Sequence, residues 1–203
     1  MDLDYLHIKG TQNTEQRKVI VTFHGWQGNM ESFLPLSKIK TYQKYDWYML
    51  NGPYKVNNDP NKRTWSYEIK PNVWEIEKPR KMIESIFNNT IFKNYKSNLT
   101  YVIGFSLGAT VCYEHICRIN KPLGGIFPIS GFCNDNKIKL NDIQINTPIL
   151  IGHGLNDNIV PSSKSEEAFS ILKKQSDNVE LCLYDSGHRM STKIIDAIAN
   201  KIG

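Results

Sequence analysis

Short runs of apolar, mostly β-branched residues alternate along the chain with longer segments whose apolar residues recur at helical spacing. The runs have the length of strands and are apolar almost throughout, which predicts strands with helices against both of their faces. They occupy residues 19–23, 47–50, 99–103, 126–129, 149–151 and 179–184. A further strand is expected at 5–9, where it would form an edge of the sheet.

The segments between the strands carry apolar stripes on one helical face. Pro79 is expected to be the first residue of one helix, whose apolar face comprises Met82, Ile83, Ile86, Phe87 and Ile91. Similar stripes follow at 109–119, 168–172 and 194–202. This alternation predicts an α/β fold, a three-layer α/β/α sandwich around a mostly parallel sheet of six or seven strands. No repeat or linker divides the pattern, so we expect a single domain over residues 1–203.

Residues 54–78 interrupt this alternation. The segment is polar and contains prolines, yet it carries four large aromatic residues: Tyr54, Trp65, Tyr67 and Trp74. We interpret it as a long loop. Its aromatic residues either hold the loop against the body of the protein or line a substrate site, and the sequence favours neither.

Composition excludes some functions and leaves others open. The chain has 25 Lys and Arg against 20 Asp and Glu, a net charge of +5. The basic residues are scattered singly, which indicates a solvated surface and no nucleic-acid site. No apolar run approaches the roughly 20 residues that cross a bilayer, and the first ten residues contain no apolar signal segment. We therefore expect a cytoplasmic protein.

Four cysteines, Cys112, Cys117, Cys133 and Cys182, form no C-x-x-C pair, and each lies in or beside an apolar segment. They are expected to be reduced, buried thiols. No group of residues has the spacing of metal ligands, and no glycine-rich phosphate loop is present, so neither a metal nor a cofactor is implied. The sequence says nothing about oligomeric state.

A candidate nucleophile lies between a predicted strand and a predicted helix. Gly104-Phe105-Ser106-Leu107-Gly108 follows the apolar run at 99–103 and precedes the helical stripe at 109–119. This is the context that a G-x-S-x-G nucleophile elbow requires. The sharp turn projects the central serine above the sheet, and the start of the helix supplies N–H groups and a favourable dipole. Ser106 is therefore our candidate nucleophile.

A serine nucleophile needs a base, and the base needs an acid. Two later strands are followed by turns that contain Asp157 and His188. The order Ser106, Asp157, His188 is that of the α/β hydrolases. Asp135, which follows another strand, competes with Asp157 as the acid. Asp185 is disfavoured because it lies too close to His188 in the chain.

The strand at 19–23 ends in His24-Gly25-Trp26-Gln27-Gly28. A turn there would direct a backbone N–H, that of Trp26, at the substrate oxyanion beside the N–H of Leu107. The side chains of Trp26, Gln27 and Trp65 are candidate contacts with the substrate. The other histidines have structural interpretations: His24 and His153 bind backbone in His-Gly turns, and His115 lies on a helix flank.

The motifs FHGWQGN, GFSLGA, GLNDNIVP and SGHRMS, which span residues 23–191, resemble those of the α/β-hydrolase superfamily. Within it the chain resembles the small acyl-protein thioesterase and carboxylesterase branch. The resemblance implies Ser106 as nucleophile, Asp157 as acid, His188 as base, and Trp26 with Leu107 as oxyanion donors. The chain departs from the branch at Leu107, where acyl-protein thioesterases typically carry glutamine, and in its His-Gly-Trp-Gln-Gly turn.

These features predict a serine hydrolase that cleaves soluble esters or thioesters of small or medium acyl groups through an acyl-enzyme on Ser106. About 15 residues lie between Phe132 and Pro148, where larger lipases insert a helical lid, so no cap domain is expected. Two alternatives remain open. One is a peptidase or amidase with the same triad, and the other is a catalytically silent binding protein of hydrolase fold.

Overall fold

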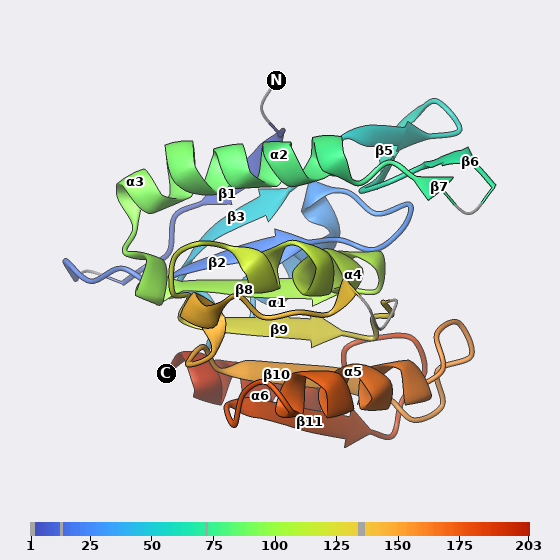
Figure 1. Ribbon diagram of the computed structural model, residues 1–203. Helices are drawn as coiled ribbons and strands as arrows, with labels where there is room; N and C mark the ends of the chain where they lie inside the picture. Colours follow the sequence, from blue (N-terminus) through green and yellow to red (C-terminus); the bar gives the residue numbers. More distant parts are fainter. Residues whose placement is uncertain (1–2, 13, 72, 134–136) are drawn as a thin grey trace.

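The protein is described by a computed structural model that covers residues 3–12, 14–71, 73–133 and 137–203. Its centre is a seven-stranded sheet in the order β1-β3-β2-β8-β9-β10-β11 (Figure 1). The strands are β1 (Tyr5–Ile8), β2 (Val19–Phe23), β3 (Asp46–Leu50), β8 (Thr100–Phe105), β9 (Gly125–Ile129), β10 (Ile149–Gly154) and β11 (Val179–Tyr184). All neighbouring strands pair in parallel except β1, which pairs antiparallel with β3 at one edge. The predicted fold class, sheet and edge strand are confirmed.

Helices cover both faces of this sheet. The helices are α1 (Leu34–Ser37), α2 (Glu77–Ile86), α3 (Phe92–Asn94), α4 (Leu107–Glu114), α5 (Ser163–Lys173) and α6 (Thr192–Ile202). Short turns complete them: η1 (Met30–Phe33), the π-helical turn η2 (Phe87–Ile91), η3 (Ser97–Leu99), η4 (Ile116–Arg118) and η6 (Asp142–Gln144). Helices α2, α4 and α5 pack on one face and α1 and α6 on the other (Figure 1).

Alternating side chains of each strand enter the two cores. Val19, Val21 and Phe23 of β2 belong to the cluster under α2, α4 and α5, whereas Ile20 belongs to the cluster under α1 and α6. All five residues of β2 are buried, as expected for a central strand between two helical layers. The apolar runs in the sequence are therefore the strands of a doubly covered sheet.

Helix α2 begins at Glu77, two residues before the predicted first residue, Pro79. Proline is tolerated there because the first N–H groups of a helix have no acceptor within it. Beyond Ile86 the helix continues through η2 into α3. The apolar residues predicted to share a face remain on one side, since Ile83, Phe87 and Ile91 all enter the core.

The prediction of a long loop at 54–78 is wrong. The segment forms two hairpins, β4 (Tyr54–Val56) with β5 (Asp59–Thr64) and β6 (Glu68–Lys70) with β7 (Val73–Trp74). Both hairpins lie beyond the carboxyl ends of the parallel strands (Figure 1). They are thus next to the turns that carry the candidate chemistry.

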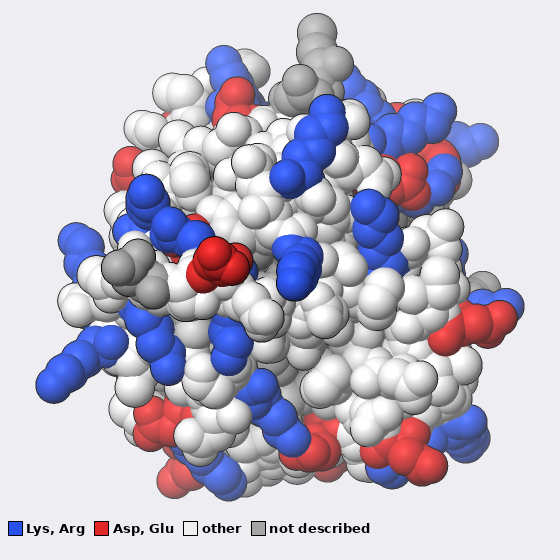
Figure 2. Space-filling model, turned by 90° about the vertical axis from the view of Figure 1, so that its left-hand side faces the viewer, with Lys and Arg blue, Asp and Glu red and all other residues white. Residues whose placement is uncertain are grey.

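The opposite end of the molecule carries dispersed charge. Figure 2 shows the face at the amino ends of the parallel strands, where Lys and Arg side chains are spread singly with Asp and Glu among them. In the described part of the chain no helix is long and apolar enough to pass through a membrane. Cys112 and Cys117 are buried as expected, whereas Cys133 and Cys182 are partly exposed.

Candidate active site

Ser106 lies between the end of β8 and the first residue of α4, with a backbone φ of 55° and ψ of −117°. Few residues other than glycine adopt this conformation, and it is typical of strained functional turns. The glycine at 108 is required because a Cβ there would lie 1.9 Å from the carbonyl oxygen of Phe23. The close approach of α4 to β2 therefore places Ser106 beside the turn that follows β2.

Asp157 and His188 meet at the same end of the sheet. The Nδ1–H of His188 donates to Oδ2 of Asp157 over 2.6 Å. The other oxygen, Oδ1, accepts from the N–H groups of Ile159 and Val160, both at 2.9 Å. Burial acts to raise the pKa of Asp157, but these hydrogen bonds outweigh it and the pKa is lowered. Asp157 is thus an ionised carboxylate that leaves Nε2 of His188 as the acceptor nitrogen.

The competing acids differ in position. Asp185 is exposed and accepts from the side-chain amide of Asn156 at 2.6 Å. Asp135 lies outside the described residues. Among the described carboxylates, Asp157 is the one that holds His188.

A second histidine contacts the same carboxylate, a role that the sequence did not indicate. Nε2 of His153 lies 2.9 Å from the Val160 carbonyl oxygen and 3.3 Å from Oδ2 of Asp157. Because a carbonyl can only accept, this nitrogen carries the proton, and Nδ1 accepts from the Ser165 hydroxyl at 2.6 Å. The backbone contact expected for His153 is present, and the same N–H also faces the Asp157 carboxylate.

The side chain of His24 stabilises the turn after β2. Its Nδ1–H donates to the Gly25 carbonyl over 2.7 Å, and its Nε2 accepts from the Gly52 N–H over 2.9 Å. Burial lowers the pKa of His24 to about 4, so the ring is neutral at physiological pH. The backbone contacts expected for this histidine are therefore present, and they tie the end of β2 to the residues after β3.

The N–H of Leu107 directly follows Ser106 in the chain, and the N–H of Trp26 belongs to the turn after β2, which approaches Ser106. In the described residues neither N–H has a hydrogen-bond partner. A Cβ on Gly25 would lie 3.3 Å from Cβ of Ser106, which shows how closely the two turns approach. Two unpaired donors at such a junction are able to receive a negatively charged oxygen.

Trp65 does not line an open site, contrary to its assignment as a substrate contact. It is fully buried, its ring packs against Phe23, and its indole N–H donates to the His24 carbonyl over 2.8 Å. Trp65 instead has the other role considered for the aromatic residues of segment 54–78, because it anchors this segment to the core of the protein. Trp26 is exposed and Gln27 is half-buried, with a left-handed φ of 62° for Gln27.

Ser106 and His188 are close to each other but are not hydrogen-bonded in this structure. No hydrogen bond joins the Ser106 hydroxyl to Nε2 of His188 among the described residues, although the His188 ring lies 4.9 Å from the ring of Phe105, the neighbour of Ser106. Such contacts are often long without substrate and tighten when it binds. The described residues also contain no cluster of His, Cys, Asp and Glu side chains suited to a metal ion.

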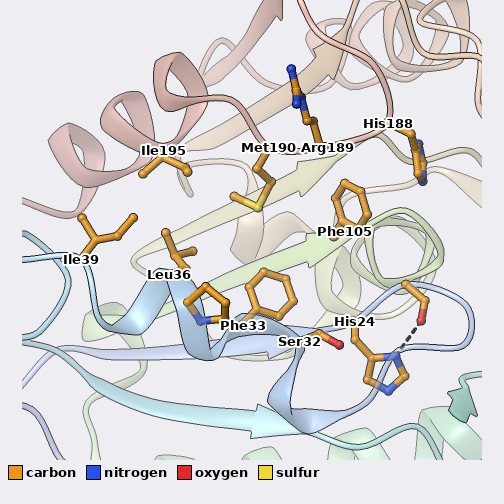
Figure 3. Close-up of a pocket in the computed structure, with 12 residues that line it drawn as sticks. His24, Ser32, Phe33, Leu36, Ile39, Phe105, His188, Arg189, Met190 and Ile195 are labelled. Carbon is orange, nitrogen blue, oxygen red and sulfur yellow. Dashed lines mark hydrogen bonds between the residues drawn. The ribbon is translucent and has the colours of Figure 1, made fainter.

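Two hollows adjoin this centre. The first, called here the Met190 groove, has a volume of about 360 Å³ and is lined by His24, Gly25, Ser32, Phe33, Pro35, Leu36, Ile39, Phe105, His188, Arg189, Met190 and Ile195 (Figure 3). The second, the Trp74 hollow, has a volume of about 210 Å³ and is lined by Ser66, Trp74, Ile76, Leu107, Thr110, Glu114, Phe132, Cys133 and Lys137. One hollow contains His188 and the other contains Leu107.

Known proteins resemble this chain in structure and sequence. Esterase PE8 superposes with a TM-score of 0.82 at 18% identity, covering 98% of this chain and 97% of that one. The carboxylesterase of Bacillus cereus gives a TM-score of 0.77 at 18% identity, covering 98% and 93%. Acyl-protein thioesterase 1 of Kluyveromyces lactis is 27% identical over 176 residues, which is 78% of this chain and 77% of the relative.

The match to a family extends over nearly the whole chain. Residues 5–203 match the family described as phospholipase/carboxylesterase. The sheet, the order of its strands and the similarity to esterase structures agree with this match. The resemblance inferred from the motifs is thus confirmed at the level of the branch: the chain belongs to the phospholipase/carboxylesterase family of α/β hydrolases.

Proposed function

We propose that this protein is a serine hydrolase that cleaves carboxylic esters or thioesters of small or medium acyl groups through an acyl-enzyme on Ser106. The observation that carries the proposal is the 2.6 Å hydrogen bond from His188 to the buried Asp157 carboxylate, beside the left-handed turn of Ser106. Membership of the phospholipase/carboxylesterase family supports ester or thioester hydrolysis. The acyl-enzyme, its residues and the size of the acyl group are our assignments.

In the first half of the reaction, Nε2 of His188 takes the proton of the Ser106 hydroxyl while the oxygen attacks the acyl carbon. The carbonyl oxygen becomes an oxyanion and accepts from the N–H groups of Trp26 and Leu107. The bond from carbon to the leaving oxygen or sulfur then breaks, and that atom takes the proton from His188. Asp157 holds the ring in the tautomer that this transfer requires.

Water completes the cycle. His188 takes a proton from water, the hydroxide attacks the acyl-enzyme carbon, and the proton returns to Ser106 as the acid leaves. Because the His153 N–H also faces Oδ2 of Asp157, the carboxylate has donors on several sides throughout. Such preorganised donors lower the reorganisation needed as charge moves.

The surroundings of the site support a small, soluble substrate. Trp26 and Gln27 flank the oxyanion turn and are assigned to substrate contact. In the described part of the connection between β9 and β10, the helical structure consists of short 3₁₀ turns, which supports a site without a helical lid. Among the described residues no disulfide joins the four cysteines, which supports a cytoplasmic location.

The proposal is tested by hydrolysis of p-nitrophenyl esters and matched acyl-thioesters by the wild type and Ser106→Ala. We expect hydrolysis of both classes by the wild type and a loss of at least about 10³-fold in kcat for the variant. Matching anilides distinguish an esterase from a peptidase or amidase, and we expect them to be cleaved far more slowly. Absence of turnover with every substrate would favour the silent binding protein and contradict the proposal.

A further inference from the structure

The Met190 groove extends from His188 to an apolar far end. Phe33 and Leu36 line one side, Phe105 and Met190 line the other, and Ile39 and Ile195 lie farthest from His188 (Figure 3). These side chains come from η1, α1 and the turn after α1 on one side, and from the end of β8 and the residues after β11, including α6, on the other. A volume of about 360 Å³ is at the small end of the range for ligand pockets. The groove thus has room for a short apolar group.

The polar side chains on the groove wall make hydrogen bonds to other parts of the chain. Both ring nitrogens of His24 bind backbone groups. The Ser32 hydroxyl accepts from the Asn29 N–H at 3.0 Å. Nε of Arg189 donates to the Ser186 hydroxyl over 2.8 Å, and its guanidinium points away from the groove in Figure 3. His188 is the titratable side chain that remains to meet a polar atom of a ligand.

The chemistry of the proposed reaction decides which part of the substrate faces His188. In the step that releases the alcohol or thiol, the bond between carbon and the leaving atom breaks, its electron pair stays on the leaving atom, and the proton arrives from Nε2 of His188. The substituent on the leaving atom must therefore lie on the His188 side of Ser106. The acyl group then lies toward Leu107, beside the Trp74 hollow.

We propose that the Met190 groove binds the leaving group of the substrate, and that this group is apolar, with an alkyl chain of about four to six carbons or a single ring. The inference rests on the proposed function and adds the chemistry of the released alcohol or thiol to it. Ile39 and Ile195, at the far end of the groove, are the residues that set the accepted length. The acyl side is not restricted by this assignment.

Two series of esters test the assignment in the wild-type protein. One keeps the acetyl group and lengthens the alcohol from ethyl to hexyl, and the other keeps ethanol and lengthens the acid. Each methylene buried in the groove is expected to raise kcat/KM about threefold to fourfold in the alcohol series. A flat or falling alcohol series overturns the inference, and it does so without any variant having to fold.

A pair of variants locates the effect in the groove. Ile39→Asp places a charge at the far end of the groove, and Ile143→Asp in η6 is its control because both isoleucines are 39% exposed and η6 lies at the amino end of β10. Hexyl acetate and ethyl hexanoate are isomers, so their ratio of kcat/KM compares the two sides of the site. We expect Ile39→Asp to lower that ratio about tenfold and Ile143→Asp to leave it within twofold.

An unchanged ratio in Ile39→Asp, or an equal fall in both variants, overturns the inference. Inhibition by 1-hexanol gives a second measurement, since Ile39→Asp should weaken it about tenfold while inhibition by hexanoate changes less. Labelling of Ser106 by a fluorophosphonate separates the two proposals. Labelling with no preference for longer alcohols contradicts the groove assignment alone, whereas absence of labelling contradicts the proposed function as well.

Discussion

At the scale of single residues, the tautomer of His188 depends on which atoms face the carboxylate of Asp157. Oδ1 accepts from two backbone N–H groups, and Oδ2 accepts from His188. An amide at this position would keep its oxygen toward the two N–H groups, because its NH₂ cannot accept from them. The NH₂ would then face His188 and force Nδ1 to accept. The ring would carry its proton on Nε2, where it cannot take the proton of Ser106.

We therefore expect Asp157→Asn to lower kcat for p-nitrophenyl acetate by about 10⁴-fold at neutral pH, the size of the effect of the corresponding change in the catalytic triad of a serine protease. Asp185→Asn is the matched control, because Asp185 is exposed and binds Asn156 instead of His188. It should change kcat less than twofold. Equal effects of the two substitutions would show that Asp157 does not orient the base.

Sequence reasoning located the candidate nucleophile, acid and base because each one follows an apolar strand, and parallel strands bring their carboxyl ends to one edge. It did not find the contact between His153 and Asp157, which depends on the fold of the turn between them. It also assigned Trp65 to the substrate. No apolar run or helical stripe in the sequence indicates that this tryptophan, which follows the hairpin of β4 and β5, lies in the core with its indole N–H on the His24 carbonyl.

At the scale of elements, the central strands were predictable because helices cover both of their faces, which makes them nearly unbroken apolar runs. The edge strand β1 lacks such a run, since its residues alternate between exposed and half-buried. The hairpin of β4 and β5 has no such run, and Pro60 within β5 argues against a strand. Its turn does carry a local signal: Asn57 and Asn58 both have left-handed φ values, of 51° and 57°, which asparagine tolerates. An Asn-Asn pair is thus the feature by which this hairpin could have been predicted.

The contact between α4 and β2 gives a prediction at this scale. In Gly108→Ala the new Cβ would lie 1.9 Å from the Phe23 carbonyl oxygen, so the strand or the helix must shift. Overpacking of this kind costs about 1–3 kcal/mol, and we expect Tm to fall by about 3–10 °C. Gly187→Ala is the control, because its Cβ would lie 3.7 Å from the nearest atom. Equal melting temperatures for wild type and Gly108→Ala would contradict this packing.

At the scale of the whole molecule, one sheet runs through the chain from β1 to β11 and separates two apolar cores. We propose on this ground that residues 1–203 form a single domain. Unfolding by urea should accordingly show one transition by fluorescence and by circular dichroism. Two separate transitions would contradict the single domain.

The buried His24 predicts how stability changes with pH. Its pKa in the folded protein is about 4, below its ordinary value of 6.5, so the unfolded chain binds the proton first as pH falls. The contribution of the neutral His24 to the free energy of unfolding is therefore at its full value above pH 6.5, and it decreases as the pH falls from 6.5 to about 4. In His24→Gln the slope of the unfolding free energy against pH should be shallower by about 1.4 kcal/mol per pH unit in this window. Identical slopes would show that His24 is not held neutral by the fold.

Covalent labelling determines whether Ser106 is the residue that forms the acyl-enzyme. The protein would be incubated with a fluorophosphonate, digested, and mapped by mass spectrometry. We predict one adduct, on the peptide that contains Ser106, that forms rapidly in the wild type and is absent in Ser106→Ala. An adduct on another residue, or an unmodified wild-type protein, would contradict the assignment of Ser106 as the nucleophile.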